Sequence, residues 1–355
     1  MPLSVQDGRV GRAFIGAALA FLIAFTANAR AQSAVEAFYK GKQINIVVGS
    51  SAGGGYDAYA RLLARHIGSY IPGNPSIVVQ NMPGAASNRA AAYVYSVAPK
   101  DGTAVGAIFP GTILQPLIGD VQVQHDPSKF IYLGSANSDQ YVCYARADAP
   151  VKKFEDALTR ELILGASNEG ATTRDLPALL NEVLGTKFRI VTGYAGSREI
   201  TLALERGEVQ GACGLGWTGI TTLHPEWFSR GTVKVLAQLG IKGNVELDRM
   251  GVPLAVSFAK AQEDRAVMEL VMSQSIFGRP FMMAPEVPTE RVAALRKAFQ
   301  DALQSKALLA EAEKMKLDIE LLSGEELQLI VRHLYATPAR VVGRARQALA
   351  ARPGR

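Results

Sequence analysis

The residues best placed to do chemistry form a glycine-rich turn between an apolar segment and a helix. Residues 44–59 read I-N-I-V-V-G-S-S-A-G-G-G-Y-D-A-Y, and the first five have the composition of a strand that is covered on both faces. Gly53, Gly54 and Gly55 let the backbone approach a ligand closely. A helix that begins near Asp57 directs its free N–H groups and the positive end of its dipole to the same point. The pattern predicts a site for a carboxylate or a phosphate.

The same turn contains the pattern of a serine nucleophile. Residues 49–53 read G-S-S-A-G, which matches G-x-S-x-G and would make Ser51 the nucleophile. In serine hydrolases this turn follows several earlier strands, because one of them supplies the oxyanion loop, whereas here it follows the first strand after the N-terminal segment. The four histidines have no supporting motif either. An exported serine hydrolase that uses Ser51 is therefore kept only as an alternative.

Nucleotide and metal sites are not indicated by the other motifs. A phosphate-binding P-loop needs a lysine after its last glycine, but Gly55 is followed by Tyr56. A dinucleotide-binding turn needs an acidic residue at the end of the next strand, and that position is Gln80. The histidines and cysteines stand singly, with no pair at helical ligand spacing. We therefore expect no metal, no cofactor and no catalytic residue.

A second glycine-containing loop joins a strand to a helix in the middle of the chain. Residues 166–174 read A-S-N-E-G-A-T-T-R, with small hydroxyl side chains where the helix begins. Serine and threonine in this place often only cap a helix, which is a structural role. Because the loop is paired with the first glycine turn, we interpret it as a second anion site that faces the first across a cleft.

Strands and helices alternate along the chain, which predicts two α/β domains with mostly parallel sheets. The expected strands are 44–49, 76–81, 104–109, two within 132–148, 161–166, 188–192, 209–214, 233–239 and 279–284. The expected helices are 57–70, 88–97, 172–184, 198–206, 263–273 and two that begin near Pro288 and Ser323.

The pattern changes near residue 136, so domain 1 is assigned residues 32–136 and 278–355, and domain 2 is assigned residues 137–277. Ligands of open α/β sheets bind beyond the carboxyl ends of strands. The loops that should face one cleft are therefore 49–57, 109–112, 166–174 and 193–198.

Composition and charge are those of a globular protein that does not bind nucleic acid. Of the 355 residues, 48% are hydrophobic and 20% are charged. The net charge is +6, but part of the excess lies in arginines at the two ends of the chain. No cluster of lysine and arginine interleaved with aromatic residues occurs between them, so nucleic acid is not expected as a partner.

The N-terminus has the pattern of a cleavable signal peptide. Arg9 and Arg12 precede an apolar run from Ala13 to Phe25, and alanines at 27, 29 and 31 provide A-x-A cleavage sites. The apolar run is about 13 residues long, whereas roughly 20 are needed to cross a bilayer. We expect residues 1–31 to be removed as a signal peptide and the mature chain to be periplasmic.

The two cysteines, Cys143 and Cys213, both lie in strand-like segments. Export to an oxidising compartment and an even count favour a disulfide between them. Two buried free thiols remain the alternative, because cysteine is often a small core residue.

With these features in hand, the chain resembles the substrate-binding proteins of tripartite tricarboxylate transporters, the Bug family of periplasmic receptors. The resemblance covers essentially the whole mature chain. It is carried by G-G-G-Y-D at 53–57, R-L-L-A-R at 61–65, I-V-V-Q-N-M-P-G-A at 77–85, A-P-K-D-G-T at 98–103 and E-R-G-E-V-Q-G-A-C-G at 205–214.

The resemblance implies a type II periplasmic-binding-protein fold, in which two α/β domains close on a small carboxylate without chemistry. Carried over to this sequence, it implies ligand binding by Ser50, Ser51, Ala52, Gly54, Gly55, Tyr56, Asp57, Ser167, Asn168, Gly170, Thr172 and Thr173. Phe109 joins Tyr56 as a wall of the cleft, and Asp57 is expected to act as a helix cap or to hold water. Arg174 or Arg198 would complement a second ligand charge, although Arg198 is equally well explained as a solvated helix residue.

The chain departs from the commoner members of the family at several positions. Gly49-Ser50-Ser51-Ala52 replaces proline and phenylalanine before the glycines, Gln210 replaces an aspartate, and Trp217 and the cysteines are features of a subgroup. These differences leave the identity of the ligand open. The expected partners are a small organic anion and the permease subunits of a tripartite transporter, with the receptor itself a monomer. A signalling receptor of the same fold, which docks on a sensor protein, is the other alternative.

Overall fold

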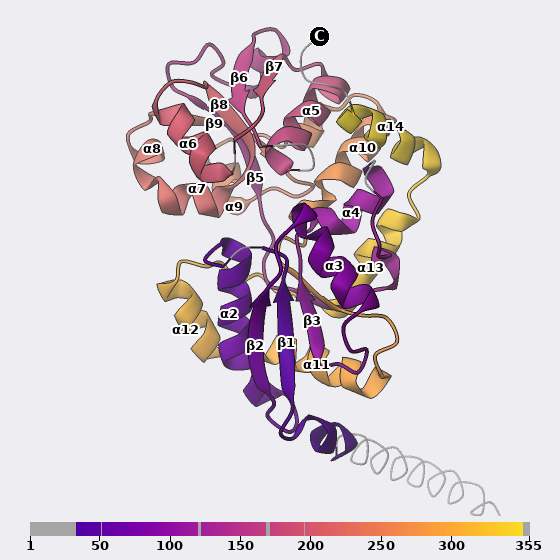
Figure 1. The fold of residues 1–355 in the computed structure, drawn as a ribbon. Coiled ribbons are helices and arrows are strands. Elements are labelled where there is room, and N and C mark those ends of the chain that lie inside the picture. The colour runs from indigo at the N-terminus through magenta and orange to yellow at the C-terminus, as the bar shows by residue number, and fades with distance from the viewer. Residues whose placement is uncertain (1–32, 51, 120–121, 168–170, 195, 351–355) are drawn as a thin grey trace, which may run out of the picture.

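The chain folds into two lobes, each built on one β-sheet (Figure 1). The computed structural model describes residues 33–50, 52–119, 122–167, 171–194 and 196–350, so the predicted signal peptide lies outside these ranges. Within them, no helix is both long and apolar enough to cross a membrane.

The first lobe contains a six-stranded sheet with the order β11-β4-β10-β3-β1-β2. Its strands are β1 (Gln43–Val48), β2 (Ser76–Asn81), β3 (Ala104–Ala107), β4 (Ile131–Ser135), β10 (Pro280–Met283) and β11 (Leu322–Ser323). The second lobe contains a five-stranded sheet with the order β7-β6-β8-β5-β9. Its strands are β5 (Tyr141–Arg146), β6 (Leu162–Gly165), β7 (Phe188–Val191), β8 (Gly211–Gly216) and β9 (Val233–Leu239).

Helices cover both sheets. They are α2 (Gly55–Ile67), α3 (Asn88–Ser96), α4 (Gly111–Ile118), α5 (Thr172–Leu184), α6 (Ser197–Glu205), α7 (Trp217–Leu223), α8 (Pro225–Ser229), α9 (Val245–Arg249), α10 (Gln262–Met272), α11 (Thr289–Leu303), α12 (Lys306–Lys314), α13 (Gly324–Tyr335) and α14 (Ala339–Ala350). In α2 the residues Ala60, Leu63 and Ile67 are buried, as their spacing on one helix face predicts.

The predicted elements are present with small shifts at their ends, and the α/β fold class is confirmed. Strands β2 and β9 and helix α5 have the predicted bounds, and α2 begins two residues earlier than expected, at Gly55. The prediction of mostly parallel sheets is wrong. β1 pairs with β2 and β3 in parallel, and β6 pairs with β7 and β8 in parallel, but β10, β4, β11, β5 and β9 all form antiparallel pairs.

Three of the strands in antiparallel pairs, β4, β5 and β10, adjoin the segments that carry the chain from one lobe to the other. Residues 136–140 lead from β4 to β5, and residues 276–279 lead from the second lobe back to β10. The two segments are bonded to each other, because Ala136 N–H donates to the carbonyl of Arg279 at 3.0 Å and Asp139 N–H donates to that of Ser275 at 2.8 Å. They form a two-stranded connection between the lobes. The predicted domain boundaries, which fall in these segments, stay a prediction.

Helix α14, which was not predicted, packs against α10 and α5 of the second lobe and against α4 of the first. Its buried face consists of Val341, Val342, Ala345, Ala348 and Leu349. The C-terminal helix therefore lies across both lobes, on the side of the molecule opposite α2 in Figure 1.

The disulfide is present between neighbouring strands of the second sheet. Cys143 in β5 is paired in register with Cys213 in β8, their Cα atoms lie 3.9 Å apart, and the sulfur atoms are bonded. Both residues are fully buried. The bridge closes a segment of 70 residues that contains β6, α5, β7 and α6.

Candidate functional site

The first glycine turn is shaped by the side chain of Asp57 and leaves the start of α2 open. Gly53 has a φ of +81°, which favours glycine, and its N–H donates to Asp57 Oδ2 at 2.8 Å. Gly54 stands at the N-cap position and no side chain caps the helix there. The backbone from Ala52 to Gly55 is exposed. The first N–H groups of α2 are therefore accessible to an anion.

Asp57 itself is buried and fully engaged. Its Oδ2 accepts from Arg61 Nε at 2.9 Å, and its Oδ1 accepts from Asn81 Nδ2 at 2.9 Å. Asn81, at the end of β2, also donates to the carbonyl of Ser50 at 3.0 Å, so it fixes the other end of the turn. Burial alone would raise the pKa of Asp57, but the hydrogen bonds from Arg61, Gly53 and Asn81 outweigh it and lower the pKa below its ordinary value.

The buried side chain of Ser87 packs against the first residue of the turn, Gly49. Ser87 is fully buried and has a left-handed backbone with a φ of +77°, which is uncommon for a residue other than glycine. Its Oγ accepts from the N–H of Phe109 at 3.2 Å. A Cβ on Gly49 would lie only 1.6 Å from the same Oγ, so the start of the turn has no room for any side chain.

Tyr56 and Phe109, which are predicted to line the cleft, contact each other. Their ring centroids are 4.4 Å apart. On the other side of Tyr56 lies Arg279, whose guanidinium carbon is 4.4 Å from the centroid of the Tyr56 ring and 5.2 Å from that of Tyr59. Arg279 was not among the residues predicted to bind a ligand.

Arg279 places a positively charged hydrogen-bond donor beside the glycine turn. Its Nη1 donates to the carbonyl of Gly278 at 2.8 Å and pairs with Asp139 at 3.4 Å. Its Nε is buried and has no hydrogen-bond partner among the described residues. Its Nη2 would lie 3.7 Å from a Cβ placed on Gly55. The guanidinium and the N-terminus of α2 therefore present positive charge to the same small region.

The surroundings of Arg279 keep it charged. Burial alone would lower its pKa, but nearby Tyr56 and Asp139 raise it above the ordinary value. Burial raises the pKa of Tyr56 to about 12, against the pull of Arg279, so this hydroxyl stays protonated. Burial also raises the pKa of Asp139, and Arg279 offsets only part of that rise.

The second loop is held by its own hydroxyl groups. Thr173 Oγ1 accepts from Ser167 N–H at 3.0 Å, and Thr172 Oγ1 donates to the carbonyl of Gly214 at 2.7 Å. Neither hydroxyl caps α5, whose N-cap residue is Ala171. Their role is to fix the path of the loop against β8. Ser51, Asn168 and Gly170 of the predicted site lie outside the described residues.

The structure brings the four predicted loops together in two pairs. Tyr56 joins the first turn to Phe109, and Tyr194 joins the last loop to Ala166 through a backbone hydrogen bond of 3.3 Å. Among the described residues, no hydrogen bond or ring contact joins Tyr56 or Phe109 to Thr172 or Thr173. The two pairs of loops are therefore separate in the recorded contacts of the described residues.

The two arginines considered as partners for a ligand charge have different surroundings. Arg198 is exposed in the first turn of α6. Arg174 is buried, pairs with Asp175 at 3.2 Å and donates to the carbonyl of Leu349 near the end of α14. Its positive charge therefore stabilises the C-terminus of α14, where the helix dipole is negative.

A hollow of about 740 Å³ lies between the lobes near α7 and α9. Its lining includes Trp217, Lys242 and Glu246 from the second lobe and Asp318 and Glu320 from the first. None of the predicted ligand residues lines it. Ser138 and Gln140 border this hollow, whereas Asp139 between them pairs with Arg279, so the two regions lie on different sides of the connection between the lobes.

Comparison with solved structures shows which fold this is. A TctC solute-binding protein from Polaromonas has a TM-score of 0.65 at 20% identity, over 86% of this chain and 99% of the other. The fold is that of the TctC and Bug solute-binding proteins. The periplasmic binding protein BugD has a TM-score of 0.62 at 21% identity, over 87% and 98%. Rpa4515 of R. palustris with adipate has a TM-score of 0.61 at 21% identity, over 86% and 97%.

No protein-family model and no curated protein sequence matches the chain. The solved structures cover nearly the whole described chain, so the solute-binding fold includes both lobes and the connection between them. The predicted type II periplasmic-binding-protein architecture, with two α/β lobes, is confirmed at the level of the fold.

Proposed function

We propose that this protein is a periplasmic receptor of the TctC and Bug type, which holds a small organic anion between its two lobes without chemistry. The observation that carries the proposal is the meeting of two positive features at one point, the open N-terminus of α2 and the Arg279 guanidinium. An anion placed there would accept hydrogen bonds from both.

The shape of the region favours a carboxylate with an apolar body. Tyr56 and Phe109 offer ring faces beside the charged point, and the Arg279 guanidinium, whose Nη2 lies near Gly55, supplies a positive charge for a carboxylate. The second loop, with Ser167, Thr172 and Thr173, provides the opposite wall, where a second polar group of the ligand would bind. The likeness to a solute-binding protein solved with adipate supports a dicarboxylate.

Serine hydrolysis gains no support from the described histidines. His66 pairs with Glu311 at 2.6 Å, His125 contacts the carbonyl of Thr112 at 3.3 Å, and His224 lies against Glu205 and Glu226. A serine nucleophile needs a histidine within hydrogen-bond reach. The proposed partner of the loaded receptor is the pair of permease subunits of a tripartite transporter. A signalling sensor is the alternative partner.

The test is a thermal-shift screen of the mature protein against mono-, di- and tricarboxylates, with matched arginine variants. A ligand at about 100 times its dissociation constant stabilises the folded protein by about 2.7 kcal/mol, which raises the melting temperature visibly. Arg279→Met removes the charge but keeps an apolar side chain over Tyr56. We expect it to weaken binding by about ten-fold to a hundred-fold, because hydrogen bonds to charged groups contribute about 1.5–3 kcal/mol.

Arg291→Met is the matched control, because the Arg291 guanidinium also stacks on an aromatic ring, that of Phe38, at 3.6 Å. It should leave the ligand-induced shift unchanged. Gly54→Leu puts a side chain at the N-cap position of α2. A ligand that still raises the melting temperature of both Arg279→Met and Gly54→Leu would bind elsewhere. No shift across the panel, with the protein folded, would contradict the assignment of a small organic acid.

A further inference from the structure

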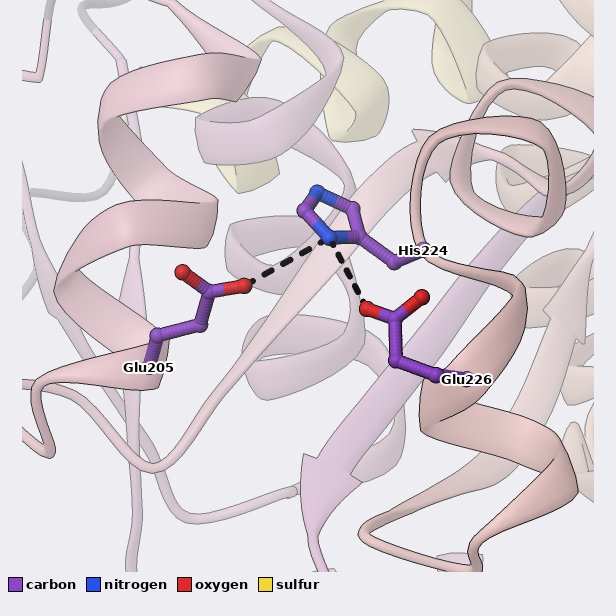
Figure 2. Close-up of side chains that lie close together, drawn as sticks. All are labelled: Glu205, His224 and Glu226. Carbon is purple, nitrogen blue, oxygen red and sulfur yellow. Dashed lines mark ion pairs between the residues drawn. The ribbon is translucent and has the colours of Figure 1, made fainter.

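Three side chains of the kinds that bind metal ions converge on the second lobe, away from the proposed ligand cleft (Figure 2). Glu205 is the last residue of α6, His224 lies between α7 and α8, and Glu226 lies in the first turn of α8. One ligand atom from each lies within 4.8 Å of the others. Figure 2 shows both carboxylates directed at the same ring nitrogen of His224.

The distances fit coordination better than hydrogen bonding. His224 Nδ1 lies 3.5 Å from Glu205 Oε1 and 3.6 Å from Glu226 Oε1. These separations are long for hydrogen bonds, whose usual range ends near 3.2 Å. Two ligands of a tetrahedral zinc ion, each bonded at about 2.1 Å, lie about 3.4 Å apart. The nitrogen and each carboxylate oxygen therefore already have nearly the spacing of two zinc ligands.

The histidine is held in place before any ion binds. Its ring stacks on the ring of Trp227, with centroids 4.0 Å apart and an interplanar angle of 14°. Trp227 is buried, and its backbone N–H donates to the carbonyl of His224 at 3.1 Å. This stacking fixes the plane of the imidazole, so that Nδ1 points toward the carboxylates. A ligand whose orientation is fixed loses less entropy when it binds a metal.

The charges of the group are unbalanced in favour of a cation. Among the ion pairs recorded for the described residues, Glu205 and Glu226 each pair only with His224. Two negative charges thus face a side chain that carries at most one positive charge. The side chains of Glu205 and Glu226 are 42% and 45% exposed, and both border a hollow of about 460 Å³ that Arg146 and Arg230 also line.

We propose that Glu205, His224 and Glu226 form a site for a divalent transition-metal ion, with Zn²⁺ as the ion that fits best. Imidazole nitrogen and carboxylate oxygen are both suitable zinc ligands, and three protein ligands leave a fourth position for water. The metal binds at Nδ1, and the proton of the neutral ring lies on Nε2. The ion would tie the end of α6 to the turn between α7 and α8. This site does not depend on the proposed receptor function.

The test is a zinc titration of the mature, untagged protein after treatment with a chelator. Calorimetry and competition with a chromophoric chelator should give one bound Zn²⁺ per chain, with release of protons as the pH falls toward the pKa of free histidine. His224→Phe keeps the stacking on Trp227 but removes the ligand nitrogen. It should weaken zinc binding at least ten-fold, and so should Glu205→Gln and Glu226→Gln.

The matched control is His66→Phe, because His66 also contacts a carboxylate, that of Glu311, at 2.6 Å, but has no second acidic partner in its recorded ion pairs. It should leave zinc affinity unchanged. Anomalous scattering at the zinc edge from a soaked crystal should place the ion between the three side chains. Absence of binding to the wild-type protein, or equal affinity in His224→Phe, would show that the group is only an ion pair of protonated histidine with two carboxylates.

Discussion

Asp57 places a negative charge within one turn of the point where we propose that an anion binds, and its neighbours make this arrangement possible. Its carboxylate accepts hydrogen bonds from Gly53, Arg61 and Asn81, so its charge is compensated within the turn. No side chain caps the N–H groups at the start of α2, and Nη2 of Arg279 lies near Gly55. The prediction that Asp57 caps the helix is wrong, because no side chain caps α2 and the Asp57 carboxylate instead holds the glycine turn.

Asp57→Asn should destabilise the protein at neutral pH by about 2 kcal/mol, because hydrogen bonds to a buried charge are lost. The pKa of Asp57 is lower in the folded protein than in the unfolded chain, where it is about 3.9. The folded state therefore gains stability from the carboxylate above that value and loses it as the pH falls through the folded pKa. Denaturant unfolding should show that wild type and variant differ less in their free energy of unfolding at pH 3 than at pH 7.

Asp301→Asn is the control for this prediction, since Asp301 pairs with Lys297 on the surface of α11. A pair of this kind contributes about 0–1 kcal/mol, so the variant should be close to wild type. If Asp57→Asn lowers the free energy of unfolding by the same amount at pH 3 and at pH 7, the charge of the carboxylate does not cause the loss of stability.

The first turn could be read from the sequence because its parts are neighbours in the chain, but Arg279 could not. Within five positions, the residues Gly53, Gly55 and Asp57 indicate a turn and the start of a helix. Arg279 reaches the turn only because the chain returns to the first lobe beside residues 136–140, and nothing around it in the sequence indicates that return. Asn81 and Ser87 were missed for the same reason, since their contacts come from other strands and loops.

At the level of elements, the predicted helices were those with a clear apolar face inside an alternating pattern. Helix α5 has the predicted bounds, whereas α4 was missed because its proline, Pro116, argues against a helix. Helix α14 was missed although its buried residues follow helical spacing. The proposed metal site of Glu205, His224 and Glu226 was not predicted, because the three residues do not have the spacing of ligands on one helix. They meet only because α6 packs against the turn between α7 and α8.

The disulfide joins two elements that already share a hydrogen-bonded ladder, so its contribution should come mainly from the unfolded chain. For a closed segment of 70 residues the chain-entropy model gives about 4 kcal/mol. Cys143→Ala together with Cys213→Ala should lower the free energy of unfolding by up to this amount, measured with guanidinium. Wild-type protein unfolded in the presence of a reductant should have the same lowered stability.

Because both cysteines are fully buried, the native protein should resist reductants until it unfolds. A double variant as stable as the oxidised protein would mean that the bridge does not constrain the unfolded chain. In that case the β5–β8 ladder alone accounts for the pairing of the two strands.

For the whole molecule, two lobes joined by a narrow connection predict a hinge. The connection consists of residues 136–140 and 276–279, and residues 318–320 of the first lobe are hydrogen-bonded to its first segment through Ala136, Asn137 and Ser138. Helix α14 packs against α5 and α10 of one lobe and α4 of the other. We expect α14 to restrain rotation on its own side, whereas on the side of α2 in Figure 1 the recorded side-chain hydrogen bond between the lobes runs from Thr218 Oγ1 to Asp318 Oδ2 at 2.6 Å. Closure on this side would bring Thr172 and Thr173 toward the first glycine turn.

A saturating carboxylate identified in the thermal-shift screen should make the molecule more compact, because a ligand that contacts both walls favours the closed arrangement. Small-angle scattering should show a smaller radius of gyration with the ligand, and the Arg279→Met variant should not respond at the same concentration. Hydrogen exchange should slow in the first turn of α2 and around residues 171–173, but not in α14, whose contacts with α5 and α4 the rotation preserves. Thermal stabilisation without compaction would mean that the ligand binds one wall alone, and protection centred on α14 would place the hinge elsewhere.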